Sequence, residues 1–243
     1  MARLNSKNII SGLVGNLVFR NLDGKQIIQS RPNHVKQTKA TKASSNEFSQ
    51  CSSWTKSIRI GLHPFLVGLT DSYMYRRFNG QFYNALLSNT NILKGQRNPL
   101  NANMSDLVGF EFNNHSLFAQ YFLPTITTST TAQHQITVTI PNFDPNTEML
   151  FPDAVTNAEL LVYIYATNFD GHSVVIDDYF VLPIDKKTPQ LSPTTFNSIV
   201  LPEDYFVLVS AKLLYYTNNK FTVKNYCNNK ALNPAMVLWA NKI

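Results

Sequence analysis

The sequence predicts a mainly β protein with an N-terminal β-hairpin and basic arm, a short helical segment and a C-terminal antiparallel β-sandwich of immunoglobulin- or fibronectin-like architecture. Charged residues make up only 15% of the 243-residue chain, and Asn, Ser and Thr supply much of its polarity. Short runs rich in Val, Ile, Tyr and Phe recur from residue 134 onward, with Asn, Asp, Gly or Pro between them. No strand–helix–strand alternation occurs, which favours antiparallel sheets.

The first predicted element is a hairpin in the stretch VFRNLDGKQII. Asp23-Gly24 lies between two apolar runs, and Asp-Gly is a strong signal for a two-residue type I′ turn. This turn would place Phe19 opposite Ile28 and would set Arg20 and Lys25 in the paired strands. Gly12 and Gly15, just before the first strand, predict a bend or a close approach of the backbone.

Residues 33–47, which follow the hairpin, are predicted to form an exposed basic arm or the start of a helix. Residues 1–60 hold ten Lys and Arg against Asp23 and Glu47, a net charge of +8, whereas residues 61–243 hold eleven basic and thirteen acidic residues, a net charge of −2. Such asymmetry indicates an acidic partner, either nucleic acid or a protein surface, or a solvated segment that keeps the chain soluble. Both interpretations stay open.

Helical periodicity begins where the arm ends. Spacings of three and four residues place Cys51, Ile58 and Leu62, together with Phe48 and Thr55, on one helix face. A second helix is predicted over DSYMYRRFNGQFYNALL, with an aromatic stripe facing the core. The predicted division of the chain is therefore a hairpin and arm over 1–47, a helical segment over 48–88, a linker with short strands over 89–133 and a sandwich over 134–243.

Strands dominate the remainder of the sequence. LVGFEFN and SLFAQYFL predict two short strands within the linker, and the Thr-rich run after them predicts a loop or an edge strand. Seven further runs are expected to form the sandwich: QITVTIP, AELLVYIYATNF, HSVVIDDYFV, FNSIVL, DYFVLVSAKLLYYT, KFTVKNY and PAMVLWAN. Asn218-Asn219 predicts a second two-residue hairpin, with Tyr216 opposite Phe221.

The sequence offers no convergent catalytic motif. It contains neither a phosphate-binding glycine loop nor a Gly-x-Ser-x-Gly elbow, and its five histidines are isolated from one another. Asp144 could begin a calcium loop, but a side-chain cap in a turn is the better interpretation. Asp177 and Asp178 are neighbours on a strand and point to opposite faces, so they cannot act as a paired acid and base. We therefore expect no enzyme activity, no cofactor and no metal.

The N-terminal segment resembles an uncharacterised protein family of Bacteroidota that is defined only as a domain of unknown function. Members begin with Gly-x-x-Gly-Asn-(Val/Leu)-Val, continue into a hairpin that ends in Asn/Asp-Gly-Lys, and close with a strand that ends in Arg-x-(Arg/Lys)-Pro. The matching residues here are Gly12, Gly15, Asn16, Leu17, Val18, Asp23, Gly24, Lys25, Arg31 and Pro32. The resemblance is strongest over residues 1–70. It implies a source in Bacteroidota or their phages and a β-sandwich in the C-terminal half, and it brings no catalytic residue.

Three function classes follow from these observations. The first and preferred one is a non-enzymatic structural or assembly protein, a subunit of a phage-like particle, filament or multi-protein machine and a homo-oligomer, whose N-terminal hairpin and arm contact neighbouring subunits. The expected partner-binding residues are Phe19, Arg20, Asp23, Gly24, Lys25, Ile28, Arg31, Lys36, Lys39 and Lys42.

The other two classes use different parts of the chain. A nucleic-acid-binding protein would use the lysines and arginines of the hairpin and arm to neutralise phosphates. A carbohydrate- or surface-binding module would use outward tyrosines, since Tyr215 and Tyr216 are consecutive on a strand and one of them must face outward. No apolar run is long enough for a membrane helix, and a cytoplasmic location is expected, with incorporation into a virion or phage-like particle for the first class.

Overall fold

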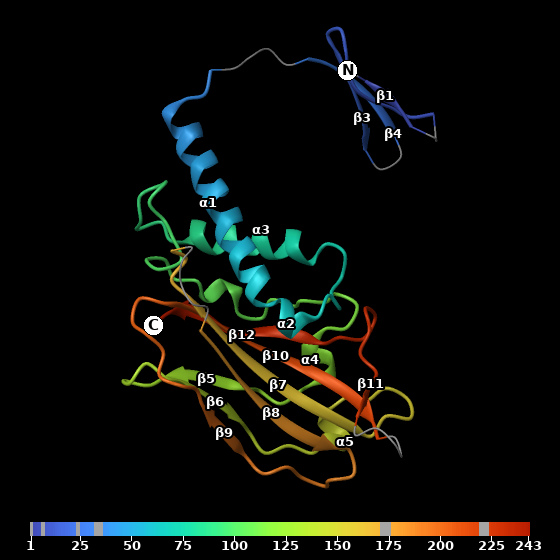
Figure 1. The fold of residues 1–243 in the computed structure, drawn as a ribbon, viewed down its shortest axis with the longest axis vertical. Coiled ribbons are helices and arrows are strands. Elements are labelled where there is room, and N and C mark those ends of the chain that lie inside the picture. The colour runs from blue at the N-terminus through green and yellow to red at the C-terminus, as the bar shows by residue number, and fades with distance from the viewer. Residues whose placement is uncertain (1, 6–7, 23–24, 32–35, 171–175, 219–223) are drawn as a thin grey trace. The chain divides into compact units, whose positions relative to one another are not determined.

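A computed structural model describes residues 2–5, 8–22, 25–31, 36–170, 176–218 and 224–243 (Figure 1). The chain divides into two compact units, residues 1–42 and residues 43–243. The segments predicted over 48–88, 89–133 and 134–243 all lie in the second unit.

The first unit is a four-stranded antiparallel sheet in chain order, formed by β1 (Arg3–Leu4), β2 (Ile10–Val14), β3 (Leu17–Leu22) and β4 (Lys25–Ser30). The predicted hairpin register is confirmed, because Phe19 lies opposite Ile28. Leu22 lies opposite Lys25, as a two-residue turn between them requires. The predicted turn residues themselves, Asp23 and Gly24, lie outside the described residues.

This sheet has two more strands than the sequence predicted. The segment expected to bend before the hairpin forms β2, which pairs with β3 through Val14 opposite Leu17. Gly15 and Asn16 form the connecting turn. Gly15 has a φ angle of 55°, which the first central residue of a type II′ turn requires and which a glycine adopts without strain. The glycine therefore closes a second hairpin instead of only bending the chain.

The second unit contains two antiparallel sheets. Their strands are β5 (Thr127–Thr130), β6 (Ile136–Ile140), β7 (Asn157–Thr167), β8 (Ile176–Asp185), β9 (Thr194–Asn197), β10 (Phe206–Thr217), β11 (Asn225–Tyr226) and β12 (Ala235–Lys242). The larger sheet has the order β11-β10-β7-β8, and β12 also pairs with β10. The smaller sheet has the order β5-β6-β9.

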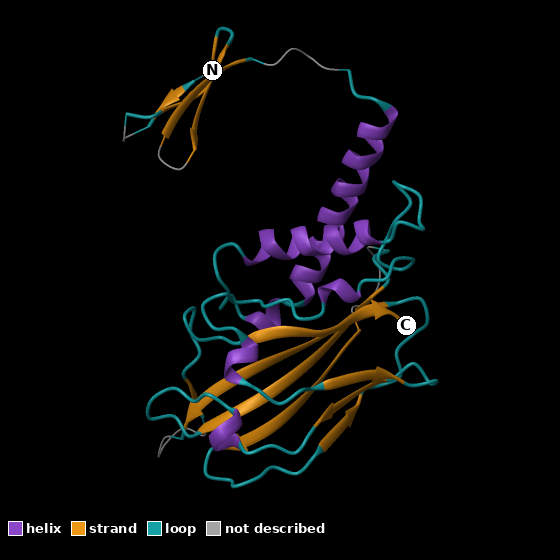
Figure 2. Ribbon diagram, turned by 180° about the vertical axis from the view of Figure 1, so that it is seen from behind, coloured by secondary structure: helices purple, strands orange, loops and turns teal. Residues whose placement is uncertain are grey.

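Helices cover the outer side of the larger sheet, and the smaller sheet lies on its other side (Figures 1 and 2). The helices of the chain are α1 (Lys39–Gly61), α2 (His63–Leu66), α3 (Met74–Ser88), the 3-10 helix η1 (Ser105–Leu107), α4 (Phe118–Tyr121) and α5 (Pro145–Glu148). The α1, α2 and α3 helices belong to the outer layer, whereas Phe118 of α4 belongs to the core between the sheets.

Alternating residues of the central strands fill the two cores. In β7, Tyr163 and Tyr165 face the helices, whereas Leu160, Val162 and Ile164 face the smaller sheet. Side chains of a strand point alternately to its two faces, so a strand that is covered on both sides supplies residues to both cores. The mainly β, antiparallel class is thus confirmed, and the immunoglobulin- or fibronectin-like connectivity stays a prediction.

The first long helix begins earlier than predicted. Periodicity indicated a helix from Phe48, but α1 starts at Lys39. The Thr38 hydroxyl accepts a 3.2 Å hydrogen bond from the backbone N–H of Thr41, which is the contact of an N-terminal cap. The predicted buried face is confirmed at Cys51 and Ile58, whereas Phe48 is 48% exposed.

The two strands predicted in the linker are reduced to one antiparallel bridge each, Glu111 with Met236 and Phe122 with Met149. LVGFEFN begins at the last residue of the 3-10 helix η1, and SLFAQYFL contains α4. In the first segment Phe110 and Phe112 lie on either side of Glu111 and are buried in the same core, as residues two apart in an extended chain are. In the second segment the Glu111 carboxylate accepts hydrogen bonds from the backbone N–H groups of Phe118 and Ala119 (2.8 and 3.3 Å), which begins a helical turn there.

The second predicted hairpin register is also wrong. Tyr216 lies opposite Tyr226, not opposite Phe221. The connection from β10 to β11 is therefore longer than the two-residue turn expected at Asn218-Asn219, and Asn219 and Phe221 lie outside the described residues.

Candidate subunit interface

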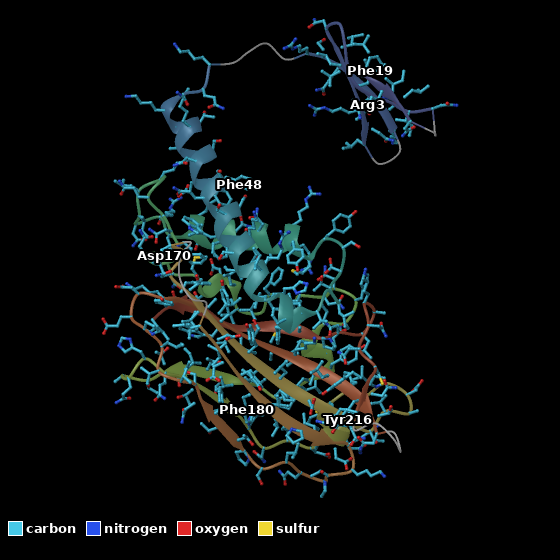
Figure 3. All side chains as sticks on the ribbon, in the orientation of Figure 1. Arg3, Phe19, Phe48, Asp170, Phe180 and Tyr216 are labelled. Atoms are coloured by element: carbon cyan, nitrogen blue, oxygen red, sulfur yellow. The ribbon has the colours of Figure 1, made fainter. Side chains whose placement is uncertain are left out.

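The N-terminal sheet has no core of its own. None of the described residues within 1–42 is buried. Figure 3 shows the side chains of this sheet, including Arg3 and Phe19, projecting from a single layer. A sheet needs a second layer over its apolar side to be stable in water, so these strands carry surface that is suited to a partner.

One face of the β2–β3–β4 ladder carries no charge. Residues opposite each other on an antiparallel ladder point to the same side, so the register places Val14, Leu17, Phe19 and Ile28 together. We call this the uncharged face. The described polar residues that share it are short or amidic: Asn21, Gln26 and Ser30.

The polar group of Gln26 on the uncharged face is largely satisfied within the sheet. Its amide accepts a hydrogen bond from the Ile10 backbone N–H at 3.2 Å and donates one to the Ile10 carbonyl at 2.7 Å. Another chain could therefore cover Gln26 at a small desolvation cost. The face is thus suited to a dry contact.

The opposite face combines apolar residues with positive charge. The register places Val18, Arg20, Lys25 and Ile27 on this side, which we call the cationic face. Arg20 and Lys25 are exposed, and neither forms an ion pair with a described residue. The sheet is therefore amphipathic, because its charge is confined to one side.

The predicted partner-binding residues are divided among three places. Phe19 and Ile28 lie on the uncharged face, and Arg20 and Lys25 lie on the cationic face. Arg31 follows β4, and its backbone N–H donates a 2.7 Å hydrogen bond to the carbonyl of Asn16.

The remaining cations of the predicted arm do not form one extended segment. Lys36 is exposed and precedes α1, but Lys39 and Lys42 lie in the first turns of that helix. The boundary of the arm at residue 47 is thus wrong, and the alternative interpretation of this stretch as the start of a helix is confirmed from Lys39 onward. The signal that this boundary missed is Thr38, an N-cap residue directly before Lys39 and Ala40, which are both good helix formers.

The candidates for chemistry elsewhere are explained by local structure. The Asp144 carboxylate caps α5 by accepting a 2.8 Å hydrogen bond from the Asn146 backbone N–H, as predicted. Asp177 and Asp178 point to opposite sides as expected, since the first binds the Tyr163 hydroxyl and the second binds the Ile199 backbone N–H. No group of three His, Cys, Asp or Glu within the described ranges is arranged to hold a metal ion.

The sequence predicts that one of Tyr215 and Tyr216 faces outward, but both are buried. Tyr215 is 0% exposed and Tyr216 is 8% exposed. The Tyr215 hydroxyl donates a 2.7 Å hydrogen bond to the Leu150 carbonyl, and the Tyr216 ring packs against Tyr226 with 5.9 Å between centroids. The prediction of a tyrosine platform for a sugar is therefore wrong, because Tyr226 of β11 covers this end of β10.

Comparisons with known proteins leave the family open. The chain matches no family model, and it shows no significant similarity to a curated protein or to a solved structure. The resemblance to the Bacteroidota family therefore stays a prediction. Within the part of the chain that the structure describes, no helix is long and apolar enough to cross a membrane.

Proposed function

We propose that this chain is a non-enzymatic structural subunit of a larger protein assembly, and that its N-terminal sheet joins it to a second copy of the same chain. The observation that carries the proposal is a four-stranded sheet in which no described residue is buried, one face of which is apolar and free of charge. In this proposal the second unit, with immunoglobulin- or fibronectin-like connectivity, is the scaffold that presents the sheet.

Charge favours a second copy as the occupant of the uncharged face. Two uncharged faces can pack against each other at the usual spacing of about 10 Å without desolvating a cation. Arg20 and Lys25, on the cationic faces, would remain in water on the outside. The same two chains could not pack through their cationic faces, since like charges would then be buried together.

The size of the face favours an assembly of many copies over an isolated dimer. Three strands of about six residues cover roughly 300 Å² per subunit. A stable pairwise interface usually buries about 800 Å² per partner. A contact of this size is weak alone, and it becomes effective when several contacts act together. A particle or filament would supply the further contacts, since the pairing of two uncharged faces by itself joins only two copies.

The experiment compares two neighbouring residues that point to opposite faces. Ile28 lies on the uncharged face and Ile27 on the cationic face, and they are 56% and 38% exposed. Sedimentation velocity of the full chain over a range of concentrations measures association for wild type, Ile28→Glu and Ile27→Glu. The two variants change the net charge equally, so they are matched controls for each other.

We expect the wild type to associate and Ile28→Glu to sediment as a monomer, because the variant buries an unpaired carboxylate. Ile27→Glu should associate like wild type, since its new carboxylate would lie opposite Arg20 in solvent. A wild type that stays monomeric at every concentration would overturn the proposal. Equal loss of association in both variants would overturn the assignment of the interface to the uncharged face.

A further inference from the structure

The N-terminal sheet has an open edge at β4. This is the last strand of the sheet, and among the described strands it pairs only with β3. Hydrogen-bonded and non-hydrogen-bonded pairs alternate along an antiparallel ladder. The two-residue turn makes Leu22 and Lys25 a hydrogen-bonded pair, and the bond from the Arg31 backbone N–H to the Asn16 carbonyl agrees with this alternation. The backbone groups that point away from β3 therefore belong to the even-numbered residues of β4, which are Gln26, Ile28 and Ser30.

The sequence of β4 does not protect this edge. Natural sheets guard an exposed edge with a proline, charged side chains, a very short strand or a covering segment. The strand β4 has six residues, and its only charged residue is Lys25, directly after the turn. The rest of the strand, QIIQS, contains no proline, glycine or charge. A neutral segment of this kind is suited to pair with another strand.

The other terminal strands of the described sheets are protected. The edge strand β8 contains a proline and three aspartates. Residues 109–112 bond to the outer edge of β12, where the Phe112 backbone N–H donates a 2.8 Å hydrogen bond to the Ala235 carbonyl. The strands β1 and β11 have two residues each, and β5 and β9 have four each. Among the described strands β4 is therefore the exception, which indicates that its edge serves a contact.

We propose that β4 pairs edge to edge with β4 of a second copy, in antiparallel direction, so that two four-stranded sheets form one continuous sheet. Residues opposite each other on an antiparallel ladder point to the same side, so the uncharged faces of the two copies would adjoin. The joined uncharged face covers roughly 600 Å², against roughly 300 Å² for one copy and about 800 Å² for one partner of a stable interface. A strand of an unrelated protein would complete the edge but would add no uncharged face, which favours a second copy.

This edge contact rests on the proposed function and extends it. Backbone hydrogen bonds between copies replace bonds to water, so their net gain is small and the edge contact alone is weak. It becomes effective when the uncharged faces also pack, because each copy then makes two different contacts. Face packing alone joins copies in pairs, whereas the two contacts together join those pairs into a tetramer or a larger assembly.

Charge and hydrogen bonding set the register of the paired edges. A two-fold axis at Ile28 would place Lys25 opposite Arg31 of the second copy, and like charges directly opposite each other destabilise a ladder. An axis at Gln29 avoids this contact and places the two Gln29 amides opposite each other, where they can hydrogen-bond. Ile27 then lies opposite Arg31 of the second copy, so the carboxylate of Ile27→Glu would gain a countercharge and the edge contact would be kept.

The test measures the size of the assembly for two variants of Ser30 in the full chain. Ser30→Pro removes an outward N–H and breaks no bond to β3, because the Ser30 backbone points away from that strand. Ser30→Ala is the matched control, since it removes the hydroxyl and keeps the N–H. At a concentration where wild type associates, sedimentation velocity should find a tetramer or a larger assembly for wild type and Ser30→Ala, and a dimer for Ser30→Pro.

Amide hydrogen exchange resolved by residue gives a second measurement. In wild type the N–H groups of Ile28 and Ser30 should exchange at least about tenfold more slowly in the assembly than after dilution to the monomer. This measurement decides the matter if Ser30→Pro sediments as a monomer, because the variant has then lost the packing of the uncharged face as well.

The outcomes separate the edge contact from the proposed function. A wild type that stops at the dimer would overturn the edge contact and leave the packing of uncharged faces in place, whereas a wild type that stays monomeric would overturn both. Equal sizes for Ser30→Pro and wild type would reject the edge contact. So would a reduced size for both Ser30 variants, or unprotected Ile28 and Ser30 amides in the assembly.

Discussion

Lys212 of β10 donates a 2.8 Å hydrogen bond from its Nζ to the backbone carbonyl of Phe65 in α2. The lysine is only 2% exposed, and it forms no ion pair with any described residue. Burial lowers the pKa of this amine to about 8. This hydrogen bond ties the helical layer to the larger sheet, and it does so at an electrostatic cost that depends on pH.

The first prediction concerns that cost. Because the pKa of Lys212 in the folded chain, about 8, lies below its ordinary value of 10.5, the unfolded chain binds more protons between roughly pH 8 and 10.5. The whole destabilising contribution of Lys212 is therefore present below pH 8, and the free energy of unfolding rises with pH between about 8 and 10.5. Lys212→Met has no such amine, so its free energy of unfolding does not include this rise. The free energy of unfolding of the variant minus that of wild type should therefore fall by about 3 kcal/mol between pH 7 and pH 10.5.

Urea unfolding of wild type and Lys212→Met at several pH values measures this difference. Comparing the two proteins at each pH cancels the titration of other groups, such as the tyrosines. A difference in unfolding free energy that is independent of pH would contradict the prediction.

The second prediction compares two helical glycines. A Cβ added to Gly61 at the end of α1 would lie 2.0 Å from Cε2 of the buried Tyr165, whereas a Cβ added to Gly80 in α3 would have no atom within 4 Å. Gly61→Ala should destabilise the chain by about 1–3 kcal/mol through overpacking. Gly80→Ala should stabilise it by about 1 kcal/mol, because alanine loses less backbone entropy in a helix.

Thermal unfolding followed by circular dichroism checks both glycine variants. They are matched controls, since each adds one methyl group to a helix. Equal changes in melting temperature for the two would show that the proximity of Tyr165 does not limit the packing at Gly61.

The third prediction concerns a buried charge. Glu47 is 0% exposed, and its carboxylate lies 3.7 Å from the Arg97 guanidinium and accepts a 3.3 Å hydrogen bond from the Gly95 backbone N–H. Arg97→Ala leaves the carboxylate without a countercharge and should cost about 3 kcal/mol. Glu47→Gln in the same chain should recover most of this loss, because the buried charge is then gone.

Denaturant unfolding of the two single variants and the double variant completes the thermodynamic cycle for Glu47 and Arg97. Additive effects would mean that the two residues do not interact, and the assignment of an ion pair at 3.7 Å would then be rejected.

The sequence predicts the local features of this fold better than the tertiary ones. The pairing of Phe19 with Ile28 follows from a two-residue turn, and the burial of Cys51 and Ile58 follows from helical spacing, so both could be read from neighbouring residues. The strand β2 was missed because Gly12 interrupts its short apolar run and Gly15 directly follows it. The buried state of Tyr216 depends on β11, which a longer connection than expected brings alongside β10.

The features of the candidate sites also divide into those that neighbouring residues predict and those that depend on tertiary packing. The cations of the hairpin are visible in the sequence, and their position on one face follows from the register once the turn is assigned. The contact between Arg59 and Tyr75 was not predictable, because the two residues belong to different helices and only their packing brings a cation against a ring. The aromatic residues of α3 were assigned to the core as a group, whereas Tyr75 is only partly buried.

The last prediction separates assembly from folding. Both hydrophobic cores consist of residues from Cys51 onward, and the boundary between the two compact units falls after Lys42. A chain of residues 43–243 should therefore unfold cooperatively within about 2–4 °C of the full chain, since both cores keep all of their residues. It should also sediment as a monomer, because it lacks the uncharged face.

The full-length variant Ile28→Glu is the matched control for this truncation, since it keeps the N-terminal sheet but blocks its proposed contact. Both proteins should be monomeric and should melt alike at low concentration. A truncated chain that melts far below Ile28→Glu would show that residues 1–42 contribute to the stability of the second unit. A truncated chain that still associates would place the contact between copies on the second unit, because the uncharged face is then absent.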